Sequence, residues 1–78
     1  MILKDNLIEL LADILEIETS DIDFQAELSE LENWDSVNSL RILTHIEDEF
    51  NIRLSMEEYS NIQKISELNE LIERVSNY

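Results

Sequence analysis

The stretch that decides the fold is residues 36–50, SVNSLRILTHIEDEF, with Trp34 and Asp35 directly before it. Apolar residues recur in it at intervals of three and four, which predicts an amphipathic helix from Ser36 to Phe50. The side chains expected to be buried are Leu40, Leu43, Ile46 and Phe50. A helix N-terminus carries partial positive charge and unpaired N–H groups. Ser36 is therefore predicted to be an exposed hydroxyl at that end, beside the Asp35 carboxylate. On these residues alone an N-cap is the favoured explanation, because aspartate and serine are both preferred caps.

The rest of the chain also favours helices, because it contains no glycine or proline. Apolar spacing predicts a helix over Ile2–Glu16, with Leu3, Leu7, Leu10, Leu11 and Ile14 on one side. A capping box at Ser55–Glu58 predicts a short helix to about Asn61, and a Ser66 cap predicts a last helix to about Ser76. Residues 17–35 show no sustained period, and we expect Phe24, Leu28 and Leu31 to pin this connection to the core. The predicted fold is an all-α four-helix bundle, three helices long and one short, in a single domain over residues 1–78.

Composition and charge disfavour several classes of function. At 78 residues the chain is too small to enclose a substrate pocket easily, so a self-contained enzyme is not expected. Its net charge of −14 disfavours nucleic acid and anionic membrane and favours basic protein surfaces and divalent cations. There is no cysteine, no apolar run long enough to insert into a membrane and no signal-peptide pattern at the N-terminus. We expect a cytoplasmic monomer.

The motif Asp35-Ser36-Val37 at the head of the second of four helices resembles the Asp-Ser-Leu motif of the acyl carrier protein family. The resemblance spans nearly the whole chain. It includes the acidic helix end Ile46-Glu47-Asp48-Glu49-Phe50, the segment Asn51–Ser55 before the short helix, and Ile62–Ile65 before the last one. Trp34 is more similar to carriers of specialised pathways, including aminoacyl and peptidyl carriers, than to the fatty-acid form.

This resemblance implies an acyl-carrier-like fold and 4′-phosphopantetheine attached covalently to Ser36 by a holo-synthase that uses coenzyme A. The arm's thiol would carry acyl or aminoacyl groups as thioesters between partner enzymes with basic docking surfaces, in fatty-acid or secondary-metabolite biosynthesis. Asp35 would orient the hydroxyl or bind the synthase's metal. The chain itself would hold no metal and catalyse no reaction. A cofactor-free helical adaptor is the alternative from another class.

Three departures from the family pattern bear on partner choice. Val37 replaces leucine, Asn33 stands where the family often has glycine, and Arg41 and Thr44 replace an acid and a methionine. We expect Val37, Arg41, Thr44 and Asp48 to line the outward stripe of the helix, with Glu47 beside them as a further partner-binding residue. Arg41 would repel a basic patch evolved for an acidic carrier. It is therefore expected to disfavour housekeeping fatty-acid enzymes.

Three further signals are weaker. Asp21, Asp23 and Glu32 fit positions 1, 3 and 12 of a calcium loop, but Ala26 stands where the template requires glycine, so an acidic surface loop is expected. The only histidine, His45, has no second histidine or cysteine for a metal site and is expected at the surface. Trp34 is expected to cover the core edge where the connection meets the helix, with ligand stacking as the alternative.

Overall fold

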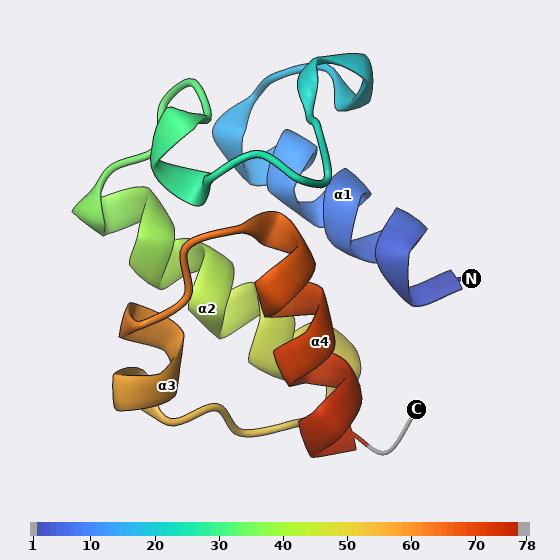
Figure 1. Ribbon diagram of the computed structural model, residues 1–78, viewed down its shortest axis with the longest axis vertical. Coiled ribbons are helices and arrows are strands. Elements are labelled where there is room, and N and C mark those ends of the chain that lie inside the picture. Colours follow the sequence, from blue (N-terminus) through green and yellow to red (C-terminus); the bar gives the residue numbers. More distant parts are fainter. Residues whose placement is uncertain (1, 77–78) are drawn as a thin grey trace.

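The computed structural model describes residues 2–76 of the chain. The described part contains four α-helices and two short 3₁₀ turns but no strand (Figure 1). In chain order these are α1 (Ile2–Leu15), η1 (Thr19–Asp21), η2 (Leu28–Glu30), α2 (Ser36–Phe50), α3 (Met56–Ser60) and α4 (Ile65–Ser76). The predicted all-α bundle of three long helices and one short helix is confirmed.

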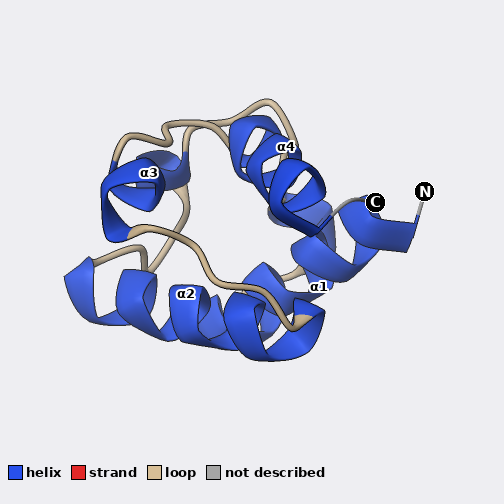
Figure 2. Ribbon diagram, turned by 90° about the horizontal axis from the view of Figure 1, so that it is seen from below, coloured by secondary structure: helices blue, strands red, loops and turns tan. Residues whose placement is uncertain are grey.

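The core forms where the apolar stripes of the three long helices meet, and α1 packs against both α2 and α4 (Figures 1 and 2). Each long helix contributes side chains at helical spacing, as predicted. The most deeply buried are Leu7, Leu11 and Leu15 of α1, Ile42 and Ile46 of α2, and Ile65, Leu68, Leu71 and Ile72 of α4. Leu3, expected on the same side of α1, lies outside the residues whose side chains are described.

One predicted core residue is wrong. Leu40 is 53% exposed, whereas Ile42, two positions later, is fully buried. Each residue turns an α-helix by about 100°, so the stripe through Leu43 and Ile46 extends back to Ser39 rather than to Leu40. The N-terminal half of α2 faces the short helix α3, and Tyr59 of α3 supplies the apolar side chain there.

The connection between α1 and α2 lies across one end of the bundle, at the top of Figure 1. Leu28 and Leu31 are buried and Phe24 packs against the core, so the predicted pinning is confirmed, and Ile22 adds a fourth anchor. The connection also contains the turns η1 and η2, and Glu27 forms an isolated antiparallel bridge with Lys64. It therefore joins α1, α2 and the start of α4.

The last helix begins at Ile65, so the predicted Ser66 cap is wrong. Ser66 lies inside the first turn, and its N–H donates to the Phe24 carbonyl at 3.1 Å while the Ile65 N–H donates to that of Ala26 at 3.2 Å. The Glu67 carboxylate accepts hydrogen bonds from the N–H groups of Gln63 at 2.9 Å and Lys64 at 3.1 Å. The helix start is thus satisfied by a distant loop and by a side chain in its own first turn.

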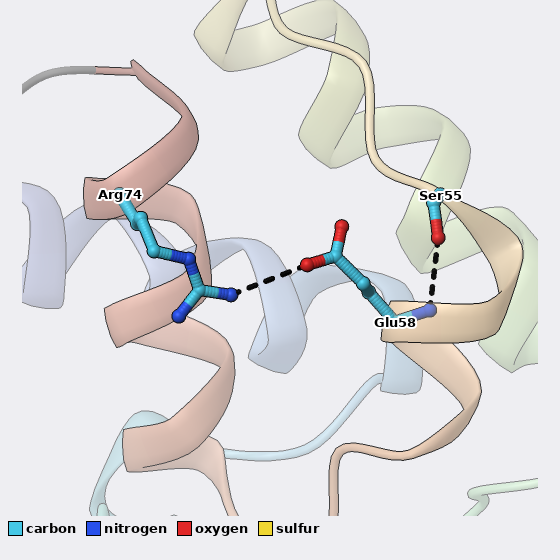
Figure 3. A network of polar contacts seen from close by, with 3 residues as sticks. All are labelled: Ser55, Glu58 and Arg74. Atoms are coloured by element: carbon cyan, nitrogen blue, oxygen red, sulfur yellow. Dashed lines mark hydrogen bonds and ion pairs between the residues drawn. The ribbon is translucent and has the colours of Figure 1, made fainter.

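The short helix α3 has a cap at its start and an ion pair to α4. Ser55 Oγ accepts a hydrogen bond from the Glu58 N–H at 2.9 Å, which is the first half of the predicted capping box. The Glu58 carboxylate points away from Ser55 and pairs with Arg74 of α4 at 3.4 Å (Figure 3). This exposed ion pair links α3 to α4.

Among residues 2–76, none of the helices has both the length and the apolar character needed to cross a bilayer.

Candidate functional site at the start of α2

The first two residues of the predicted motif have different roles at the helix start. Asp35 is the N-cap, with its Oδ1 accepting the Asn38 N–H at 2.7 Å. Ser36 is the first helical residue, is exposed, and its hydroxyl has no hydrogen bond to any other residue in the described part of the chain. Because Asp35 caps the helix, the Ser36 hydroxyl is free to react at the positive end of the helix dipole.

The turn before the motif depends on Asn33, which adopts a left-handed conformation with φ of 68°. Asparagine tolerates this region better than most residues, so it can replace the glycine that the family often has there. Asn33 Nδ2 donates to the Leu15 carbonyl at the end of α1 at 2.7 Å, and Asn38 Nδ2 donates back to the Asn33 carbonyl at 2.9 Å. The start of α2 is therefore tied to the end of α1.

Ser36 opens onto a groove of about 570 Å³ between η2, the first half of α2 and α3. Apolar side chains form much of its lining, and two of them, Leu40 and Met56, are more than half exposed. The lining residues are Glu27, Leu28, Ser29, Trp34, Ser36, Ser39, Leu40, Met56, Tyr59, Ser60, Ile62 and Gln63. Trp34 is half-buried and packs against the core, which confirms its predicted place at the core edge, and it also lines this groove.

A buried tyrosine joins the two helices beneath the groove. The Tyr59 hydroxyl donates to the Ser39 carbonyl at 2.8 Å and accepts a longer bond from Ser39 Oγ at 3.3 Å. Burial raises the pKa of the Tyr59 phenol above its ordinary value of 10.0, and the hydrogen bond with Ser39 lowers it by less. Ser39, the nearest other serine on α2, is thus engaged with α3, whereas Ser36 is not.

The outward stripe of α2 contains four of the five residues proposed to contact partners. Val37, Arg41, Thr44 and Asp48 are all exposed, and Val37 is 65% exposed. Arg41 donates to Asn38 Oδ1 at 3.2 Å, so its guanidinium is held beside a residue two positions after Ser36. Glu47 differs from the other four because it is half-buried, and its carboxylate accepts the Leu54 N–H at 2.9 Å. This hydrogen bond fixes the segment that leads into α3 to the end of α2.

The weaker sequence signals lie apart from Ser36. His45 is exposed, as predicted, with Nδ1 2.8 Å from the Arg41 carbonyl oxygen. Asp21, Asp23 and Glu32 lie on the exposed connection, where Asp23 Oδ1 accepts the Gln25 N–H at 3.0 Å. Within residues 2–76 no group of three or more histidine, aspartate or glutamate side chains is arranged to hold a metal ion.

Sequence reasoning missed the groove itself. Ser39, Leu40, Met56 and Tyr59 come from two helices, and their meeting depends on how α3 docks, which no local pattern specifies. The exposure of Leu40 was detectable, because the helical period places Ser39 rather than Leu40 in line with Leu43 and Ile46.

A comparison with known families finds a match over most of the chain. The family model described as phosphopantetheine attachment site matches residues 5–73, which is most of the chain. The chain belongs to the phosphopantetheine attachment site family. Members of this family carry 4′-phosphopantetheine bound covalently to a serine and serve as carrier domains. A comparison with curated proteins finds no significant match.

The start of α2 fits the group that this family carries. A phosphodiester attached there would meet the N–H groups and positive dipole of a helix fifteen residues long. The exposed hydroxyl leaves room for a covalent bond, and the groove beside it offers apolar and hydroxyl surface to a flexible arm. The residues that would hold the group are Ser36, by the bond itself, and the first N–H groups of α2.

Proposed function

We propose that the chain is a carrier protein whose 4′-phosphopantetheine arm is attached to Ser36. The observation that carries this proposal is the free, exposed Ser36 hydroxyl on the first residue of α2, with Asp35 taking the cap. Of the two serines on this helix, only Ser36 is exposed and has its hydroxyl unengaged within the described residues. Membership of a family defined by this modification supports the same assignment.

In the loading reaction, Ser36 Oγ forms an O–P bond to the β-phosphorus of coenzyme A. The bond from that phosphorus to the bridging oxygen breaks, adenosine 3′,5′-bisphosphate leaves, and the synthase accepts the hydroxyl proton. The second oxygen of Asp35 has no hydrogen bond within residues 2–76, which leaves it available to the synthase's metal or to the serine hydroxyl. Once bound, the arm supplies a thiol that holds cargo as a thioester. The protein supplies the attachment point and the docking surface rather than catalysis.

The exposed stripe of Val37, Arg41, Thr44 and Asp48 is the proposed docking face, with Glu47 at its margin. It begins next to Ser36, so an enzyme that reaches the arm approaches along it. A small apolar contact surrounded by charge suits a transient complex in which electrostatics set the association rate. Arg41 is a base on an acidic molecule, so the matching partner carries an acid opposite it and a fatty-acid enzyme with a uniformly basic patch docks poorly.

Two cargo classes remain within this proposal, acyl groups and the aminoacyl groups of a nonribosomal-type pathway. The alternative of another class is a helical adaptor that binds a partner through the same stripe and never carries the arm. Intact mass separates these alternatives, because only a carrier gains a phosphopantetheinyl group.

The test is to incubate the unmodified protein with coenzyme A and a broad-specificity holo-synthase and to map the adduct by peptide mass. We expect one adduct, on Ser36, and none in Ser36→Ala. Ser39→Ala is the matched control and should be modified at near wild-type rate, because Ser39 lies one turn further along the helix and bonds to Tyr59. Modification that persists in Ser36→Ala, or no modification of the wild type, would overturn the assignment.

A further inference from the structure

The floor of the groove beside Ser36 consists of two residues. Of the side chains that line the groove, only Leu28 and Tyr59 are buried, with 4% and 6% of their surface exposed. The others are exposed or half-buried and form its walls and rim. Leu28 and Tyr59 also belong to the hydrophobic core. They are therefore the side chains that separate the groove from the interior of the bundle.

Tyr59 is the larger of the two and is fixed in place. Its hydroxyl is bonded twice to Ser39 of α2, so the ring cannot swing out without breaking two partly buried hydrogen bonds. Its helix is held at the start by the Ser55 cap and on its outer side by the pairing of Glu58 with Arg74 (Figure 3). The Tyr59–Ser39 hydrogen bonds therefore tie α3 to α2, and a chain that enters between these two helices would have to break them.

We propose that Tyr59 is a specificity-determining residue that closes the groove toward the core and limits this carrier to short, compact cargo. The inference rests on the proposed function, since it concerns cargo tethered at Ser36. A short acyl or aminoacyl group fits against Trp34, Leu40 and Met56 at the surface. A long alkyl chain would have only part of its surface shielded from water there, because the Tyr59 ring fills the space through which the chain would enter the core.

The experiment uses a tethered probe that needs no holo-synthase. The chain has no cysteine, so Ser36→Cys introduces a unique thiol at the mouth of the groove. The thiol is labelled with N-methylmaleimide or N-octylmaleimide. Its sulfur adds to the double bond, its proton goes to the neighbouring carbon, and nothing leaves. The measured quantity is the difference in thermal midpoint between the octyl- and methyl-labelled forms.

With Tyr59 intact, we expect a difference near zero. In Tyr59→Ala on the same background, the octyl chain refills the space of the lost ring, and the octyl form should melt about 3 °C or more above the methyl form. Tyr59→Phe keeps the ring and should behave like the parent. Leu68→Ala is the matched control, because it opens a cavity in the core at a residue that does not line the groove. It should show no octyl gain.

An octyl gain with Tyr59 intact that equals that of Tyr59→Ala would overturn the proposal, and so would the absence of a gain in Tyr59→Ala. An equal gain in Tyr59→Phe or in Leu68→Ala would also overturn it. If Tyr59→Ala does not fold, Tyr59→Val replaces it with the same expectation. Because labelling bypasses phosphopantetheine, failure here leaves the Ser36 attachment test unaffected, and failure of that test leaves this measurement valid.

Discussion

At the turn into α2, Asn33 holds a backbone conformation that usually calls for glycine. The chain contains no glycine, and the described residues with positive φ are Glu16, Asn33 and Asn51. Asn33 differs from the other two in its side-chain bond to the end of α1. The residue that replaces a family glycine thus shapes the turn and also positions Ser36.

We predict that Asn33→Ala lowers the free energy of unfolding by about 2 kcal/mol. About 1 kcal/mol or more comes from forcing alanine into the left-handed region, and the rest from losing the bond to the Leu15 carbonyl. Asn33→Gly keeps the conformation and loses only the bond, so it should cost about 1 kcal/mol. Urea unfolding measures both. Equal costs for the two variants would show that the backbone conformation contributes nothing.

At the scale of elements, the sequence located the helices well and their starts less well. The helical periods within residues 2–16, 36–50 and 66–76 predict the long helices to within one residue at each end, because each helix must bury one face. The Ser55 cap was found because its partner lies three residues away. The sequence predicts the start of α4 one residue too late, because its first N–H groups donate to the carbonyls of Ala26 and Phe24, and such distant contacts leave no local pattern.

The candidate site likewise has one part that the sequence predicts and one part that it does not. The place of Ser36 and Asp35 at the start of a helix can be predicted because the signals for it lie within a few residues of one another. The groove cannot be, because Tyr59 reaches it from a separate helix. The apolar character of Leu40 and its distance of three residues from Leu43 predict a core position, yet it lies exposed in the groove lining.

The start of α4 predicts an acid-dependent loss of stability. The N–H groups of Gln63 and Lys64 hold the pKa of Glu67 below its ordinary value of 4.5. A carboxylate with a lowered folded pKa stabilises the fold fully above its unfolded pKa, and this contribution disappears as pH falls through the folded value. We therefore expect Glu67→Ala to lower the urea midpoint at pH 7 and to have a smaller effect near pH 3. Glu70→Ala, an exposed site on the same helix, is the control. A Glu67→Ala effect that is equal at both pH values would contradict the prediction.

At the scale of the whole molecule, charge repulsion is the dominant electrostatic feature. A net charge of −14 is confined to a body of about 28 × 27 × 20 Å, and within residues 2–76 the only ion pair is Arg74 with Glu58. Many like charges therefore lie within one Debye length, which is about 10 Å at 0.1 M salt. Self-repulsion of this kind destabilises the compact state.

We predict that the thermal midpoint rises by several degrees between low salt and 0.2 M sodium chloride, and that millimolar magnesium also raises it. Screening weakens the repulsion in the folded state more than in the expanded unfolded chain. Differential scanning calorimetry at matched ionic strengths of the two salts separates screening from cation association. A midpoint that is unchanged or lower at high salt would count against this account.

The crossing of residues 24–28 over the first turn of α4 has a consequence for how the molecule opens. Three backbone hydrogen bonds join Phe24, Ala26 and Leu28 to residues 63–66, nearly forty positions away, and Ile65 is fully buried at that junction. If residues 24–28 detach from α4, the first turn of α4 loses its hydrogen-bond partners and Ile65 becomes exposed in the same event. The two segments therefore behave as one cooperative unfolding unit, so their amide protons exchange with solvent through a shared opening rather than by separate fraying.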